Sequence, residues 1–291
     1  MAGVEVRVHT NLETFWTLAR PLYAADPVRH TVVLTIVDRL LTAPATDGDA
    51  PPVLVTVHDN HELCGAVLRT PPWSLIATGL PLAAAELVAG VLAEIDPTLP
   101  GVNGPVPQAE AFAAAWMALT GMRQRRTMAM RVYRLGELEV PDTPGAARVA
   151  TRADVPQLAA WHEAFTDEAL DGRHSSQSAE EAILGSLESG AGNLLWEHHD
   201  EVVAWAVARR PTMAMSRIGP VYTPPERRGR GYGSAVTAAA SQWAIDAGAD
   251  AVVLNTDLAN PVSNSIYQQI GYRPVLDAAE LAFLPAHPRT A

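Results

Sequence analysis

Two segments of this 291-residue chain repeat one pattern, and the repeat limits the folds that the chain can adopt. The segment H-D-N-H-E-L-C-G-A-V-L-R-T-P in the first half corresponds to H-H-D-E-V-V-A-W-A-V-A-R-R-P in the second. Each is a polar turn followed by an apolar run and a proline, the pattern of a β-hairpin whose second strand ends near the proline. Later in each half, L-T-G-M-R corresponds to Q-I-G-Y-R. We therefore expect a tandem duplication of one α/β unit.

The elements around these segments follow the same order in both halves. In the first half, an amphipathic helical pattern over residues 11–41 precedes the hairpin, and a short strand and two helices follow it. The second half restarts with a strand and two helices and continues in the same way. Between the halves, G-E-L-E-V-P-D-T-P-G-A-A has the proline, glycine and acidic content of a linker. We expect domains at residues 1–135 and 147–291, joined by a linker at 136–146.

Composition excludes several classes of protein. Hydrophobic residues make up 48% and charged residues 18% of the chain, which indicates a globular protein with a sizeable core. The net charge of -11 argues against nucleic-acid binding. All 21 basic residues are arginines, so no lysine can act as a catalytic amine. Because no apolar run reaches membrane-spanning length and no signal-peptide core is present, we expect a cytoplasmic protein that binds neither membrane nor nucleic acid.

Metal and thiol chemistry are not indicated. The single cysteine, Cys64, permits no intrachain disulfide, and its apolar neighbours predict a buried, inert thiol. The run His198, His199, Asp200 falls on a hairpin turn, where adjacent side chains point apart, and no further ligand cluster lies nearby in the sequence. We expect no metal site.

One stretch, Ile218 to Ala235, has the pattern of an anion-binding loop. It reads I-G-P-V-Y-T-P-P-E-R-R-G-R-G-Y-G-S-A: an apolar strand, two prolines that end it, three glycines, and a helical pattern from Ser234 to Gly248. The backbone N–H groups of a first helical turn have no partner within the helix, and the helix dipole favours negative charge there. The sequence therefore predicts a site for a phosphate group, with three arginines beside it.

A second stretch downstream completes the pattern. After the buried-type strand A-V-V-L-N-T-D comes N-P-V-S-N-S-I-Y-Q-Q-I-G-Y, in which Asn260 is expected to cap a helix, Pro261 to begin it and Gly271 to end it. Asn260 and Tyr267 are two helical turns apart and are expected on one face. Together, the two stretches resemble the GNAT superfamily of N-acetyltransferases, over roughly residues 147–283.

The resemblance implies an α/β fold, with a mixed, mostly antiparallel sheet flanked by helices, present here as tandem GNAT-like domains. It also implies acetyl-CoA as the cofactor: backbone amides of the R-x-x-G-x-G segment would hold the pyrophosphate, and the end of the preceding strand would pair with the pantetheine arm. The matching cofactor-binding positions are Val221, Tyr222, Thr223, Arg228, Gly229, Arg230, Gly231, Tyr232, Gly233, Ser234 and Asn260.

The resemblance further implies direct attack of a neutral amine on the thioester. Tyr267 matches the position of a general acid that protonates the leaving thiolate, a role that suits a phenol with a pKa of about 10. A backbone N–H near Val221 or Tyr222 would stabilise the oxyanion. The base stays open among an ordered water and the side chains of Asp257, Glu197, Glu201, His198 and His199. The acceptor is expected to be a small-molecule or peptide amine, and nothing indicates an oligomeric state.

The first half lacks the residues that carry this chemistry. Aligning Gly121 with Gly271 puts Met117 opposite Tyr267 and Glu110 opposite Asn260, and only L-P-L stands where the glycine loop should be. We expect a degenerate GNAT-like domain; a separate regulatory module, or a coincidental repeat, is the alternative. For the whole chain the alternatives are a non-catalytic acyl-CoA-binding or sensor protein and another nucleotide-binding α/β enzyme, although no G-x-x-x-x-G-K-[ST] loop is present.

Overall fold

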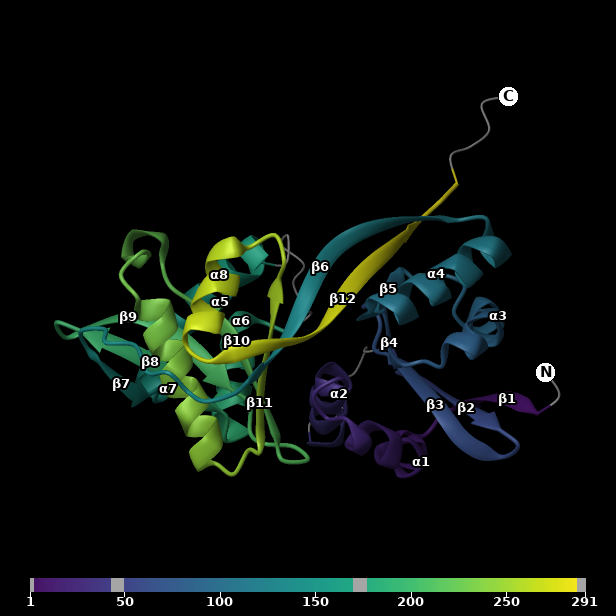
Figure 1. Ribbon diagram of the computed structural model, residues 1–291, viewed down its shortest axis with the longest axis horizontal. Helices are drawn as coiled ribbons and strands as arrows, with labels where there is room; N and C mark the ends of the chain where they lie inside the picture. The colour runs from purple at the N-terminus through teal and green to yellow at the C-terminus, as the bar shows by residue number, and fades with distance from the viewer. Residues whose placement is uncertain (1–2, 43–49, 170–176, 287–291) are drawn as a thin grey trace. The chain divides into compact units, whose positions relative to one another are not determined.

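The computed structural model describes residues 3–42, 50–169 and 177–286 (Figure 1). The contacts within the chain divide it into two compact units. The first unit consists of Met1–Val132, Asp257–Ala259 and Leu276–Ala291, and the second of Tyr133–Thr256 and Asn260–Val275.

The helices and strands occur in the same order in both halves of the chain, which confirms the expected duplication. Each half has a strand, two helices, three strands, a helix, a strand, a helix and a last strand. The first set comprises β1 (Val4–His9), α1 (Leu12–Ala25), α2 (Thr31–Thr42), β2 (Val53–Asp59), β3 (Glu62–Arg69), β4 (Leu75–Gly79), α3 (Ala85–Ile95), β5 (Gly101–Pro105), α4 (Val106–Thr120) and β6 (Arg123–Leu135).

The second set starts after the segment expected to be a linker. It comprises β7 (Ala146–Val149), α5 (Val155–Ala169), α6 (Ala179–Glu188), β8 (Gly192–His198), β9 (Glu201–Ala208), β10 (Met215–Tyr222), α7 (Tyr232–Asp246), β11 (Ala251–Asp257), α8 (Pro261–Gln269) and β12 (Tyr272–Leu284).

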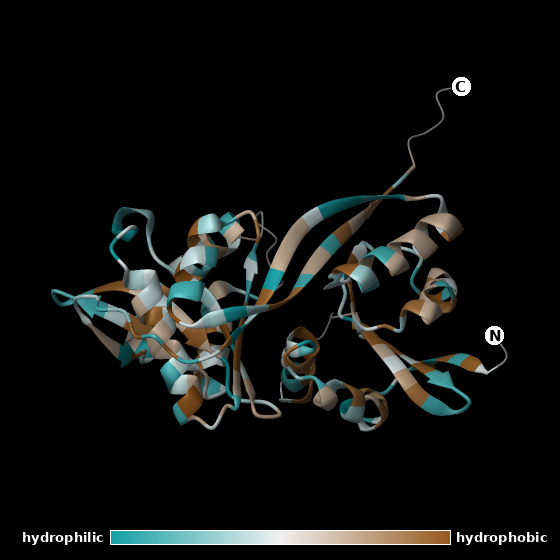
Figure 2. Ribbon diagram, viewed as in Figure 1, coloured by the Kyte–Doolittle hydropathy of each residue, from teal (hydrophilic) through white to brown (hydrophobic). Residues whose placement is uncertain are grey.

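Both sheets are mixed and mostly antiparallel, as the resemblance implied. Their strand orders are β1-β2-β3-β4-β5 in the first unit and β11-β10-β9-β8-β7 in the second. Within these orders, only β4 with β5 and β10 with β11 are parallel. Figure 2 shows hydrophobic residues along β2 and β3 and hydrophilic residues at the turn that joins them, which agrees with the continuous burial along the middle of β2 and the second half of β3.

Two local expectations were wrong. The helical pattern over residues 11–41 forms two helices, α1 and α2, because Pro27 disfavours helical backbone at Asp26 and ends α1 there. Cys64 is exposed, because it lies near the turn end of β3, where Glu62 is also exposed, whereas burial is continuous only from Gly65 to Arg69.

The two faces of the second sheet carry separate cores. The core toward α7 and α8 includes Ala206, Ile218, Val236, Leu254 and Tyr267. The core toward α5 and α6 includes Leu158, Ile183, Trp205, Val207 and Tyr222. The face of the sheet to which a side chain on β10 or β11 points therefore determines whether it packs toward α7 and α8 or toward α5 and α6.

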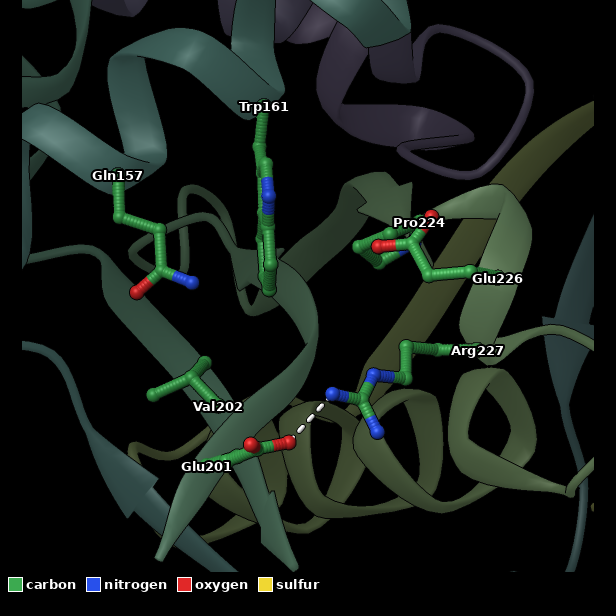
Figure 3. Close-up of a pocket in the computed structure, with 7 residues that line it drawn as sticks. All are labelled: Gln157, Trp161, Glu201, Val202, Pro224, Glu226 and Arg227. Atoms are coloured by element: carbon green, nitrogen blue, oxygen red, sulfur yellow. Dashed lines mark hydrogen bonds and ion pairs between the residues drawn. The ribbon is translucent and has the colours of Figure 1, made fainter.

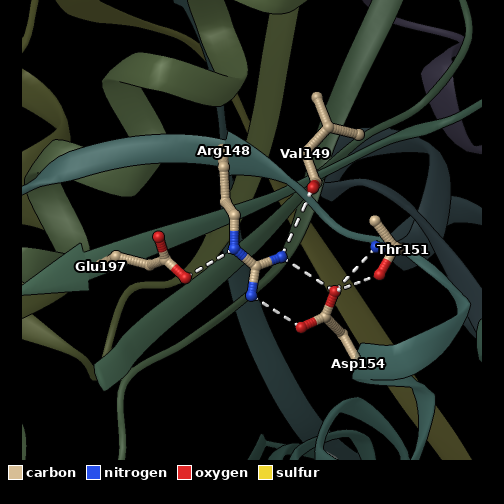
Figure 4. A network of polar contacts seen from close by, with 5 residues as sticks. All are labelled: Arg148, Val149, Thr151, Asp154 and Glu197. Atoms are coloured by element: carbon tan, nitrogen blue, oxygen red, sulfur yellow. Dashed lines mark hydrogen bonds and ion pairs between the residues drawn. The ribbon is translucent and has the colours of Figure 1, made fainter. Parts of the chain in front are cut away.

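A polar network fastens β7 to the rest of the second unit (Figure 4). Arg148 donates through Nε to Glu197 on β8 at 2.6 Å and through Nη2 to Asp154 at 2.7 Å. Asp154 also accepts the N–H and hydroxyl of Thr151, at 2.7 and 3.0 Å, and so closes the 3-10 turn Arg152–Asp154 that leads into α5. These bonds, above all that to Arg148, lower the pKa of Asp154 to about 2.

Strand β12 is divided between the two units. Tyr272–Val275 lies in the second unit, whereas Ala278–Ala282 pairs antiparallel with β5 in the first. Phe283 then stacks on Trp116 in the first core, at 5.5 Å between ring centroids. The compact units therefore differ from the expected domain ranges in the last part of the chain. Within the described ranges, no helix is long and apolar enough to cross a membrane.

Candidate active site

Strands β10 and β11 separate at one end, and this opening is the centre of the candidate site. The two strands pair over four residues each, and Ile218 with Leu254 is the last pair. Beyond it, β10 continues to Tyr222 and β11 to Asp257 with no further pair between them in the part of the chain described. The other edge of β10 still pairs with β9. The edge that faces the opening can therefore pair with an extended ligand.

The chain leaves β10 through a short 3-10 turn and enters α7 through two glycines. Gly229 has φ +75° and Gly231 φ +82°, in the left-handed region that glycine adopts without strain. Gly231 is the N-cap of α7 and makes no side-chain cap hydrogen bond. The N–H groups of the first turn are thus left for a ligand. The predicted strand, glycine loop and helix are present, with α7 starting at Tyr232.

Of the three arginines in the loop, two are already paired. Arg227 donates to Glu201, and Arg228 donates to Glu168 at 2.7 Å. Arg230 is exposed, and it has no hydrogen bond or ion pair among the described residues. Arg230 is therefore the loop arginine whose charge is available to a phosphate.

The end of β10 is fixed to both neighbouring helices. The Thr223 carbonyl accepts from Arg228 Nε at 2.9 Å, and Thr223 Oγ1 lies 3.4 Å from where a Cβ on Gly233 would be. Tyr222 packs on Trp161 of α5, with ring centroids 5.8 Å apart. Val221 packs into the core toward α7. The side chains of these strand residues are thus engaged in the fold, and what remains for a ligand is their backbone.

The two expected binding residues at the start of α7 differ in burial. Tyr232 is only 4% exposed, and its hydroxyl lies 2.9 Å from His198 Nδ1. Its side chain therefore points into the protein, and Tyr232 can offer a ligand only its backbone N–H. Ser234 is partly buried within the first turn.

Helix α8 begins and ends as the sequence predicts. The Asn260 side chain accepts the Ser263 N–H at 3.0 Å, Pro261 is the first helical residue, and Gly271 has φ +102° after the last turn. Asn260 is exposed and holds the helix start, whereas Tyr267 is 8% exposed in the core toward α7. The two residues thus differ in burial, although two turns separate them.

Burial raises the pKa of Tyr267 to about 12, and a hydrogen bond with Ser263 opposes part of that effect. The Tyr267 ring meets Tyr272 edge-on, with centroids 6.2 Å apart. At neutral pH this phenol is a hydrogen-bond donor and does not ionise.

The base candidates fall into two groups. Glu197 is paired with Arg148, Glu201 with Arg227, and His198 with Tyr232, all on the hairpin β8–β9, which lies across β10 from the opening. His199 is on the turn of that hairpin. Asp257 ends β11, the strand that borders the opening, and its Oδ1 accepts the Ala259 N–H at 2.8 Å.

A pocket of about 340 Å³ lies on the β9 side of β10 (Figure 3). It is lined by Gln157, Trp161, Glu201, Val202, Pro224, Glu226 and Arg227. Figure 3 shows Trp161 reaching down between Gln157 and Pro224, with the Glu201–Arg227 ion pair below. The lining comes from α5, from the start of β9 and from the segment that follows β10.

Two polar residues near the opening were missed by the sequence analysis. Arg217 lies on β10 one residue before the last pair, and Asn255 lies on β11 one residue after it. Arg217 interrupts the apolar run M-S-R-I, and Asn255 follows A-V-V-L. A polar side chain inside a buried-type strand was the available signal.

The first unit has a different structure at the corresponding place. Strand β4 ends at Gly79, and Leu80 and Pro81 lead directly into the 3-10 turn Leu82–Ala84 and then α3. A Cβ on Gly79 would lie 2.6 Å from the Ala66 carbonyl oxygen, so this glycine serves packing. No glycine loop separates β4 from α3.

Comparison with known proteins agrees with this geometry. Residues 157–272 match the acetyltransferase (GNAT) family, so the second half of the chain contains a GNAT domain. The match includes the opening, the glycine loop and α8. It supports an acyltransferase that takes its acyl group from coenzyme A. No curated protein sequence matches the chain significantly.

Solved structures share the fold across nearly the whole chain. A GNAT-family acetyltransferase from Colwellia psychrerythraea has a TM-score of 0.60 at 11% identity, covering 96% of this chain and 98% of that one. A protein described as a tandem GNAT protein from the clavulanic acid biosynthesis pathway has a TM-score of 0.58 at 13% identity, covering 98% and 99%. A Drosophila protein reaches a TM-score of 0.66 at 16% identity, covering 96% and 98%. These likenesses show a tandem GNAT fold.

Proposed function

We propose that the second unit transfers an acetyl, or another small acyl, group from coenzyme A to an amine. One observation carries the proposal: β10 runs past its last pair with β11 and continues directly into a glycine loop and an uncapped helix start. An unpaired strand edge suits a pantetheine arm, and the helix start next to it suits a pyrophosphate. The residues present therefore fit coenzyme A, which supplies the thioester.

In this proposal, backbone groups do most of the binding. The N–H groups from Gly229 to Ser234 hold the pyrophosphate, and Arg230 adds a positive charge. The free backbone edge of Val221–Thr223 holds the extended arm. Arg228 ties the loop to the strand end, and Asn260 fixes the start of α8 beside it.

The chemical step forms a carbon–nitrogen bond and breaks a carbon–sulfur bond. Coenzyme A, when bound, would supply the thioester that the neutral amine attacks, and a backbone N–H at Val221 or Tyr222 would stabilise the negative charge on its carbonyl oxygen. Tyr267 would donate a hydrogen bond, and finally a proton, to the departing sulfur, and the proton taken from the amine would be returned to Tyr267. The proton of the amine leaves to one of the base candidates or to water.

We further propose that residues 1–135 form a degenerate copy that supports the active one. Its strand β4 passes through Leu80 and Pro81 into the 3-10 turn before α3 without a glycine loop. The proposed domain ranges are 1–135 and 147–291, with a linker at 136–146, and the location is the cytoplasm.

The test is release of free thiol from acetyl-CoA in the presence of a panel of small amines and peptides. Wild-type protein should release thiol with at least one amine, and Tyr267→Phe should lose most of that turnover while binding coenzyme A as before. Binding without release for every amine would instead establish a non-catalytic acyl-CoA sensor. Absence of coenzyme A binding would refute both functions.

A further inference from the structure

Arg217 of β10 lies opposite Arg209, which directly follows β9. Ile218 lies opposite Ala208, so Arg217 lies opposite Arg209, whose N–H donates to the Arg217 carbonyl at 2.9 Å. Like charges at directly opposite positions destabilise a sheet. Burial, and then the charge of Arg209, lower the pKa of Arg217 to about 10. The fold alone therefore does not stabilise a cation at Arg217.

Arg217 also lacks the partner that comparable arginines have. Four other arginines of the second unit are paired with carboxylates: Arg148, Arg152, Arg227 and Arg228. The Arg217 guanidinium has no hydrogen bond or ion pair among the residues that the structure describes. Arg217 is partly buried, and an anion that binds beside it offsets the cost of burying an unpaired cation.

Asn255 provides a second unpartnered group on the same face of the sheet. Ile218 and Leu254, which pair, both enter the core toward α7, so Arg217 and its partner Val253 face the other way. Asn255 is two residues beyond Val253 and shares that face. Its Oδ1 is buried and accepts no hydrogen bond within the described ranges. Asn255 is also the first β11 residue past the last pair, so it lies at the opening.

We propose that the acceptor is an amine that carries a carboxylate close to the amino group, as amino acids do. The Arg217 guanidinium binds the carboxylate through charge-assisted hydrogen bonds, and Asn255 Oδ1 accepts a hydrogen bond from the amine N–H. The amine is thereby held at the start of the opening, where the proposed function needs its nucleophile. This inference rests on that proposed function, and it explains two groups that the fold leaves unpaired.

The test compares amino acids with their carboxamides, which keep the amine and remove the negative charge. Thiol release from acetyl-CoA is measured for wild type, Arg217→Gln and Arg217→Lys, with Arg210→Gln as the control, since Arg210 is exposed on the neighbouring segment. Wild type should prefer at least one amino acid over its amide by 10-fold or more in kcat/KM. Arg217→Gln should lower kcat/KM for that acid about 100-fold and for its amide less than 3-fold, and Arg217→Lys should retain part of the preference.

Coenzyme A affinity, measured by calorimetry, should be unchanged in both Arg217 variants. The inference is overturned if the wild type shows no preference for the acid over its amide. It is also overturned if Arg217→Gln loses activity toward acid and amide equally. In both cases the proposed acetyltransferase function is unaffected. If no amine is acetylated, we measure how much each acid and each amide raises the melting temperature of the coenzyme A complex. Equal shifts for acid and amide overturn the inference as well.

Asn255→Leu gives an independent signature. Removing a buried, unpaired oxygen should leave the melting temperature unchanged or raise it, because no hydrogen bond is lost. The same substitution should lower kcat/KM for the preferred amino acid at least 10-fold. Retention of full activity would contradict the role assigned to Asn255.

Discussion

Arg228 donates its Nε–H to the carbonyl of Thr223 at 2.9 Å, so the proposed pyrophosphate loop is tied to the strand end by its own arginine. We predict that Arg228→Ala raises the dissociation constant of coenzyme A about 10-fold and lowers the melting temperature, because the loop loses this bond and the ion pair with Glu168. Arg230→Ala should weaken binding and its salt dependence without changing the melting temperature, since Arg230 has no partner among the described residues. Calorimetry at two salt concentrations, with thermal unfolding, checks both variants; equal melting temperatures would contradict the assigned tie.

Gly229 and Gly231 allow a controlled comparison of alanine substitutions in the loop. Both have positive φ, but a Cβ on Gly231 would also lie 2.8 Å from Thr143 Oγ1, whereas a Cβ on Gly229 meets nothing within 4 Å. We expect Gly229→Ala to cost about 1 kcal/mol and Gly231→Ala about 2 to 3 kcal/mol of unfolding free energy. Adding Thr143→Ala to Gly231→Ala should recover the difference. Denaturant unfolding measures all four proteins, and no recovery would show that the strain lies elsewhere.

Ionisation of Tyr267 should not reduce kcat at alkaline pH. Burial raises its pKa to about 12, so the phenol stays protonated throughout the range from pH 6 to 10. Tyr267→Phe should therefore lower kcat by about 100-fold at every pH in that range and leave the shape of the profile unchanged. A decline of wild-type kcat centred below pH 10 that disappears in Tyr267→Phe would contradict this account.

Asp154 should make the second unit sensitive to acid. Its pKa is depressed in the folded state, chiefly by Arg148, so its contribution to stability is present above pH 4 and is lost as the pH falls toward 2. Arg148→Gln should cost about 1 to 2 kcal/mol at pH 7 and flatten stability between pH 4 and 2. Arg152→Gln breaks the exposed pair with Glu188 and should change stability little. Thermal unfolding against pH distinguishes them, and identical profiles would count against the network.

Phe283 should stabilise the first unit although it comes from the end of the chain. It is 8% exposed and stacks on Trp116. Phe283→Ala should destabilise the first unit by about 3 kcal/mol, whereas Val275→Ala, at a position 47% exposed on the same strand, should change stability by less than about 0.5 kcal/mol. Hydrogen exchange of β5 amides reports the loss; unchanged protection in Phe283→Ala would refute it.

The features predicted from the sequence are those that local chemistry determines. Gly231 and Gly271 adopt positive φ, and Asn260 with Pro261 starts a helix, because these residue types favour such conformations wherever they occur. The order of elements followed from the same local signals, repeated twice.

The features that were missed depend on residues distant in sequence. Arg228 forms an ion pair with Glu168, which is 60 residues away in the sequence. In the pairing of β12 with β5, Leu281 lies opposite Val102. The periodicity of apolar residues predicts that a segment is a strand, but it does not predict with which strand the segment pairs. Similarly, the sequence shows that Arg217 and Asn255 are polar, but whether a partner reaches them is a property of the folded chain.

The return of β12 to β5 has a consequence for biosynthesis. The ribosome releases β1 to β5 first, but their sheet cannot gain the strand Ala278–Ala282 until nearly the whole chain has been made. At roughly 5 to 20 residues per second, the intervening segment takes on the order of 10 s to emerge. During that interval, the edge of β5 and the site for Phe283 on Trp116 are exposed to other nascent chains and to chaperones. The half of the protein that is synthesised first is therefore the half that is completed last.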